Sequence, residues 1–231
     1  MNTATGYSFT PDALRLVGVA RLAYVRKVYT YFTIAMGFAI FGTLLAMQTG
    51  LWMAFAQHPF IGMILFFGSF MLASKSANNP GRAVPTLSLA TFVSGLYIAP
   101  TLFAISHGFI RGMSTDTIYN ALILTGAIFS GLTLYTFVSR KDFSYMGASL
   151  TIGLFMLIGA SFINIFVHSS TLDLSLSIIS VILFSGFILF DTSRILQRAH
   201  EVPPTLAALS LYLDFLNLFL ALLRILGRNR D

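Results

Sequence analysis

The chain has 231 residues, of which 56% are hydrophobic and 10% charged, with a formal net charge of +6 and no cysteine. This composition lies far outside that of soluble domains and indicates an integral membrane protein. The lack of cysteine excludes disulfides and thiolate metal sites. The basic residues are dispersed among short loops and form no continuous face, which excludes a nucleic-acid-binding surface.

Apolar segments long enough to cross a bilayer occur seven times along the chain. A helix of about 20 residues spans roughly 30 Å of hydrocarbon, and connections of about ten residues leave no room for a soluble domain. The sequence therefore predicts an all-α, polytopic membrane protein, a bundle of seven transmembrane helices. The predicted spans are Val28–Met47, Pro59–Ser74, Val84–Ser106, Thr117–Val138, Tyr145–Val167, Leu174–Ile195 and Thr205–Leu226.

Residues 1–26 are too polar to be a removed signal peptide, and the apolar run after them is too long for one and has no small-x-small cleavage site. We therefore expect a cytoplasmic amino-terminal tail that is retained. Its basic stretch from Arg15 to Lys27 is interleaved with leucines, which is typical of a helix lying on anionic lipid. Residues 27–231 then form the transmembrane domain.

The loops predict the orientation, because short loops rich in Lys and Arg stay on the cytoplasmic side. Seven complete crossings with an inside amino terminus leave Arg224, Arg228 and Arg230 outside, whereas a last segment that dips in and returns keeps them inside. We expect seven full spans, since the first helices usually dominate orientation. The basic residues that follow the second, fourth and sixth spans are Lys75, Arg82, Arg140, Lys141, Arg194 and Arg198.

The last span contains a carboxylate, Asp214, in an otherwise apolar segment. An aspartate near the centre of a membrane helix costs about 2.5 to 3.5 kcal/mol, so its side chain should avoid lipid. Helical periodicity gives this span one polar or small stripe, and we therefore expect the last helix to be central in the bundle. The stripe consists of Ser210, Asp214, Asn217, Ala221 and Arg224.

A second carboxylate, Asp191, lies in the sixth span. The loop to the last span is short, so the two helices should be antiparallel neighbours with Asp191 and Asp214 at similar depth. Two carboxylates in a low-dielectric site share a proton and titrate as a unit. The charge of such a pair changes with pH, so the pair is a candidate pH sensor. When both are ionised they suit a divalent cation such as calcium. Alternatively, each aspartate is structural, bonded to a neighbouring helix or paired with Arg194 or Arg198.

Other polar residues give weaker signals. Asn164 in the fifth span is a candidate for a pore or for bonding between helices. An intramembrane aspartyl protease would need Gly-x-Gly before its second aspartate, where this chain has Leu211–Leu213. His58, His107 and His168 show no metal-ligand spacing. We expect neither an enzyme nor a resident metal or other cofactor.

Five stretches of the sequence carry a resemblance to a known family. They are "YVRKVYTYFTIAMG" at 24–37, "SGLYIAPTLF" at 94–103, "YTFVSRKDFSYMGASL" at 135–150, "FSGFILFDTSRIL" at 184–196 and "LYLDFLNLFLALLRILG" at 211–227. The chain resembles the transmembrane Bax inhibitor motif family, also called the Bax inhibitor-one family, and in particular its bacterial inner-membrane branch.

The resemblance implies seven helices with the last in the middle, and a calcium leak channel whose pH sensitivity resides in a di-aspartyl pair. Asp191 and Asp214 match that pair. It also implies a second possibility, a non-conducting adaptor or modulator of a membrane-anchored ATP-dependent protease. Besides that protease, the expected partners are the lipid bilayer and calcium as the permeant ion. The other residues expected to support the pore or gate are Asn217, Ser210, Asn164, Arg194 and Lys75.

One departure from the family pattern concerns the second span. The family's channels pair the two carboxylates with an arginine there, and this chain has no arginine between Lys27 and Arg82. Lys75 is the available substitute, a point charge without the planar fork that binds carboxylates through two hydrogen bonds.

Overall fold

The computed structural model describes residues 11–199 and 201–228, with side chains from residue 18 onward. Every regular element in this part of the chain is a helix, and the predicted all-α class is confirmed. The helices are α1 (Pro11–Thr49), α2 (Leu51–Gln57), α3 (Pro59–Ser76), α4 (Ala83–Ser106), α5 (Thr115–Ser139), the short 3₁₀ helix Ser144–Met146, α6 (Gly147–Val167), α7 (Ser170–Gln197) and α8 (Pro204–Arg228).

Local signals set several helix boundaries. Pro59 occupies the first turn of α3, where a missing N–H costs nothing. The Ser169 hydroxyl accepts a hydrogen bond from the Leu172 N–H at 3.3 Å and caps the start of α7. α5 and α6 each end in a left-handed residue, Arg140 and His168, both with φ of 51°.

Seven of these helices are long and apolar enough to cross a membrane. Each predicted span lies within one of the seven candidate spans, of which the fifth, Ser144–Val167, comprises the 3₁₀ helix and α6, so the seven-span prediction is confirmed. The last, α8, is one unbroken helix of 25 residues, which favours a full crossing over a segment that returns to the same side. Sequence reasoning missed α2, which fills the connection between the first two spans and begins after Gly50 at φ 79°.

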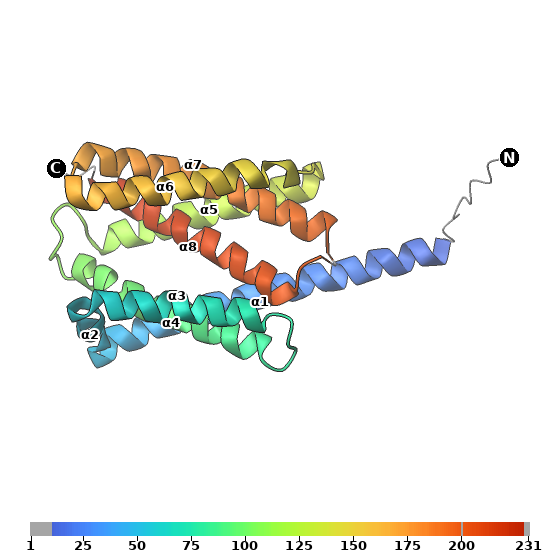
Figure 1. The fold of residues 1–231 in the computed structure, drawn as a ribbon, viewed down its shortest axis with the longest axis horizontal. Coiled ribbons are helices and arrows are strands. Elements are labelled where there is room, and N and C mark those ends of the chain that lie inside the picture. The colour runs from blue at the N-terminus through green and yellow to red at the C-terminus, as the bar shows by residue number, and fades with distance from the viewer. Residues whose placement is uncertain (1–10, 200, 229–231) are drawn as a thin grey trace.

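α1 is longer than the predicted first span. It has 39 residues, and its first turns project beyond the other helices (Figure 1). The predicted boundary between tail and span at residues 26 and 27 falls inside this helix, which passes through it without a break. An interfacial position for the tail stays a prediction, and residues 1–10 and the Arg15 side chain lie outside the described part.

The last helix lies in the middle of the bundle, as predicted. In the most apolar 18-residue stretch of each segment, 67% of the residues of α8 are buried, against 11% for α6. It packs on α1, α4, α5 and α7, and Figure 1 shows it crossing between α3 and α6. The side chains of Leu211 and Leu218 are completely buried in this packing.

The two ends of the bundle differ in charge. We call the end that carries the α3–α4, α5–α6 and α7–α8 connections the amino-terminal end, and the opposite one, where α8 stops, the carboxy-terminal end (Figure 1). Arg111, Arg224 and Arg228 lie at the carboxy-terminal end, and Arg230 is outside the described residues. The amino-terminal end carries Lys75, Arg82, Arg140, Lys141, Arg194 and Arg198.

Candidate functional site

The two intramembrane carboxylates meet in the core of the bundle. Asp191 on α7 is 9% exposed and Asp214 on α8 is 5% exposed. Their carboxyl groups lie close enough to interact directly. The short α7–α8 connection makes the helices antiparallel neighbours. The structure therefore brings together the two acids singled out from the sequence and buries both side chains.

Apart from this carboxyl–carboxyl contact, Asp214 is poorly provided with partners. Its Oδ2 atom is buried and accepts no hydrogen bond from an N–H or hydroxyl group of the described residues. A buried ionised carboxylate without donors is costly. The facing carboxyl of Asp191 is able to donate only when it carries a proton. The arrangement is thus suited to one proton held between two carboxyls.

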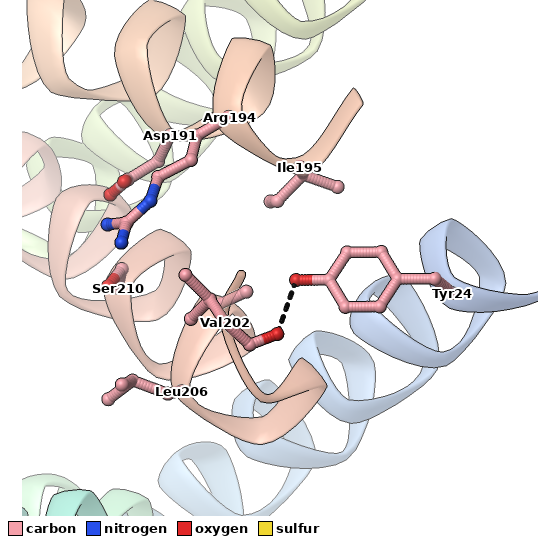
Figure 2. Close-up of a pocket in the computed structure, with 8 residues that line it drawn as sticks. Tyr24, Asp191, Arg194, Ile195, Val202, Leu206 and Ser210 are labelled. Carbon is pink, nitrogen blue, oxygen red and sulfur yellow. Dashed lines mark hydrogen bonds between the residues drawn. The ribbon is translucent and has the colours of Figure 1, made fainter. Parts of the chain in front are cut away.

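A small cavity of about 140 Å³ reaches Asp191 from the amino-terminal end. Figure 2 shows Asp191 and Arg194 pointing together toward Ser210. On the other side of this cavity, the Tyr24 hydroxyl donates to the Val202 carbonyl at 3.0 Å and ties α1 to the α7–α8 connection. Asp191 therefore lines a cavity at this end of the bundle, whereas Asp214 does not.

A second, larger cavity of about 670 Å³ runs along α8. All five residues of the stripe predicted from helical periodicity line it, so the stripe faces a cavity and not a packed helix. Asp191 and Ser210 line both this cavity and the smaller one. The apolar wall facing the stripe comes from α3 and α6 and includes Phe66, Phe67, Leu154, Ile158, Phe162 and Ile165.

The cation nearest in sequence to the pair is Arg194, less than one turn beyond Asp191 on α7. It lines the smaller cavity, and its charge acts on Asp191. Lys75 on α3 is exposed and lines neither cavity. Among the described residues, the charge beside the pair thus comes from α7 and not from α3.

The two candidate asparagines have different surroundings. Asn217 lines the larger cavity and donates through Nδ2 to the Leu213 carbonyl at 2.8 Å. Asn164 accepts from the Ser169 N–H at 3.1 Å and closes the turn between α6 and α7. Asn164 lines neither cavity that holds the pair. In the described part of the chain, no group of His, Asp or Glu residues is arranged to hold a metal ion.

Sequence reasoning missed the loop between α5 and α6, which docks on α7 beside the pair. The Phe143 N–H donates to the Ser193 hydroxyl at 2.9 Å, two residues from Asp191. In the same loop, hydrogen bonds from the Ser144 side chain and backbone hold the pKa of Asp142 below its usual range. The partners are some 50 residues apart, so no local sequence pattern reveals them.

A buried pair of hydroxyls, also missed, fixes α8 against α4. Tyr212 is 1% exposed, and its hydroxyl hydrogen-bonds the hydroxyl of Ser94. A buried tyrosine usually finds such a partner, because an unpaired hydroxyl in the core is costly. Tyr212 lies two residues before Asp214, so this bond helps to fix the rotation of α8 that turns Asp214 toward α7.

Comparisons with known proteins agree with this architecture. The family model described as inhibitor of apoptosis-promoting Bax1 matches residues 21–231. An uncharacterized membrane protein of Vibrio cholerae is 37% identical over 226 residues, covering 94% of this chain and 96% of its own. Bax inhibitor 1 of Schizosaccharomyces pombe is 32% identical over 222 residues, covering 91% and 79%. Protein lifeguard 4 of Mus musculus is 43% identical over 109 residues, covering 47% and 46%.

Proposed function

The chain belongs to the Bax inhibitor-1 family of membrane proteins, and from this premise we propose that it is a passive, pH-sensitive leak for cations, with calcium as the preferred permeant ion. The gate is the carboxyl pair Asp191 and Asp214. No resident cofactor is required, because the chemistry consists of proton exchange and ion passage.

The observation that carries the proposal is the position of the pair between two cavities. Asp191 and Ser210 line both cavities and Asp214 lines the long one, so the small and the long cavity adjoin at the level of the pair. With one proton between them, the carboxyls attract and hold the helices together. When that proton leaves, two negative charges in contact repel each other, and the repulsion favours separation of the helices.

The open pair offers a suitable place for a divalent cation. Two ionised carboxylates supply up to four oxygens, the ligands that calcium prefers. Ser210 and Asn217 add a hydroxyl and an amide oxygen along the same stripe. Flux should therefore rise with pH over the range in which the pair loses its proton.

The test is calcium flux into liposomes that contain the purified protein, measured between about pH 6 and pH 8. We expect the pH dependence to disappear in Asp191→Asn and in Asp214→Asn. Asp116→Asn is the matched control, because Asp116 is exposed and lines neither cavity. Wild-type pH profiles in both pair variants, with all proteins monodisperse, overturn the proposal.

The multi-pass protein has bacterial relatives, and we place it in a bacterial inner membrane with its amino terminus in the cytoplasm. The support is the excess of basic residues at the amino-terminal end of the bundle. Because the chain lacks cysteine, a maleimide labels only a cysteine that has been introduced by substitution. A membrane-impermeant maleimide applied from outside should label Thr115→Cys and spare Asn79→Cys. The reverse pattern contradicts this orientation.

A second candidate function is that of a non-conducting adaptor or modulator for a membrane-anchored ATP-dependent protease. The observation that favours it is the exposed position of Lys75, the sole charged residue of α3. The arginine on this helix with which the family's channels pair the two carboxylates is thus lacking here. Crosslinking in native membranes separates the two functions: a stable protease partner together with no flux from the isolated protein favours the adaptor.

A further inference from the structure

A second polar cavity lies at the carboxy-terminal end of the bundle, away from the carboxyl pair. It measures about 350 Å³ and is lined by three arginines and one acid. Arg111 comes from the α4–α5 loop, Arg224 and Arg228 from the last two turns of α8, and Asp173 from the first turn of α7. The lining carries a formal excess of two positive charges. We call it the arginine pocket.

The protein itself does not neutralise these arginines. Among the described residues, none of the three arginines forms an ion pair. The ion pair that is present joins Arg198 to Glu201, at the opposite end of the bundle. Arg228 donates one hydrogen bond to the Ser170 carbonyl, and its remaining N–H donors stay available. Guanidinium groups bind phosphate in a planar, two-bond geometry, so three of them around one cavity favour a phosphate-bearing anion.

The arginine pocket continues into the long cavity along α8, whose wall from α3 and α6 is apolar and whose opposite side carries the polar stripe of α8. Arg224 lines both this pocket and the long cavity along α8, so the two meet at its side chain. Arg224 is four residues before the last residue of α8, which is about 6 Å along the helix axis. Arginine side chains this close to the end of a membrane helix reach the lipid headgroups. Beyond Arg224, the groove between α3 and α6 has the aromatic and aliphatic wall described above.

We propose that an anionic phospholipid occupies this composite site. Its phosphate binds Arg111, Arg224 and Arg228, and one acyl chain lies in the groove between α3 and α6. The charge of the pocket matches an anionic headgroup, and the apolar wall matches a hydrocarbon chain. Free phosphate would satisfy only the first feature. A zwitterionic lipid offers a phosphate and an acyl chain, but the positive charge of its headgroup is repelled by the excess positive charge of the pocket. The proposal does not depend on the leak function, because it concerns binding alone.

The test compares lipids retained by the full-length protein. Delipidated protein is incubated with phosphatidylglycerol or phosphatidylcholine of identical acyl chains, and bound lipid is counted by native mass spectrometry. We expect wild type to prefer phosphatidylglycerol. Replacing Arg111, Arg224 and Arg228 together by Gln should lower this preference by roughly a hundredfold, since each basic residue contributes about 1 kcal/mol and about 1.4 kcal/mol corresponds to a factor of ten.

The matched control carries three Gln substitutions at the amino-terminal end, at Arg82, Arg140 and Lys141, and should keep the preference. Ile158→Trp, which fills the groove, should weaken phosphatidylglycerol binding and leave inorganic phosphate binding unchanged. Equal retention of the two lipids by wild type overturns the proposal, as does an arginine variant that still prefers phosphatidylglycerol. Inorganic phosphate that binds as tightly as the lipid contradicts a lipid site and indicates one for a free anion.

Discussion

α6 and α8 have almost the same mean hydropathy, 2.2 and 2.0, but opposite positions in the bundle. In the most apolar 18-residue stretch of each, only 11% of the residues of the α6 segment are buried, and side chains such as Phe155 and Phe166, both 70% exposed, point outward. In α8 the share is 67%, and this helix carries Asp214. Hydropathy thus identifies a membrane-spanning helix but does not show whether it is central or peripheral in the bundle. A carboxylate indicates a central position, because a helix that carries one must turn it toward protein or water.

The same contrast appears within the long cavity. α6 contributes its wall with apolar side chains such as Leu154 and Phe162, whereas α8 contributes the polar stripe. The opposite side of α8 is apolar and packs against α1, α4 and α5. α8 is therefore amphipathic inside a membrane, and its polar face is directed at a cavity rather than at water outside the bundle.

The largest loss of stability should come from truncating a buried side chain of α8. Leu218 is completely buried, so Leu218→Ala leaves a cavity that its neighbours fill only partly, and we expect a loss of about 3 to 4 kcal/mol of stability. Ile163 on α6 is 58% exposed, and Ile163→Ala should cost less than about 1 kcal/mol. Unfolding of both variants in the same detergent measures the difference. Equal losses would contradict the central position of α8.

A somewhat smaller effect should follow when an aspartate is introduced at an outward-facing position of α6. Phe155→Asp places a carboxylate in lipid near the middle of α6, at a cost of about 3 kcal/mol for insertion. The yield of protein in the membrane fraction should fall well below that of the control Phe155→Leu. If the aspartate variant accumulated like the control, a carboxylate would not discriminate between lipid-facing and central helices.

The smallest effect concerns the loop beside the pair. The pKa of Asp142 is lowered, chiefly by hydrogen bonds from Ser144, so its ionised form favours the folded loop. This contribution is present above the usual aspartate range near pH 4 and is lost as pH falls through the lowered pKa. Asp142→Asn should slightly reduce thermal stability at pH 7 and make no difference at about pH 2. It should leave the pH dependence of flux between pH 6 and 8 unchanged, and a shifted profile would implicate this loop in gating.

Much of the bundle could be predicted from the sequence, because its signals are local. Runs of apolar residues mark the spans, the 3.6-residue period aligns Ser210, Asp214 and Asn217, and a short loop brings α7 beside α8. The contact between Asp191 and Asp214 follows from these three facts.

The remaining features depend on contacts between distant parts of the chain. The docking of Phe143 on Ser193 joins residues 50 positions apart. The rotation of α3 that leaves Lys75 exposed follows from how all of its neighbours pack. The arginine pocket likewise collects Arg111 from a loop and Arg224 and Arg228 from a helix end more than 100 residues later. No periodicity or motif contains this information.

The central claim, that the two carboxyls share one proton, is tested most directly by infrared titration of the protonated carboxyl band between about pH 5 and pH 9. Wild type, Asp191→Asn and Asp214→Asn are compared in the same bilayers. We predict that replacing either aspartate shifts the titration of the one that remains, since each carboxyl sets the proton affinity of the other. A remaining aspartate that titrates as it does in wild type would show that the two ionise independently and would contradict the account.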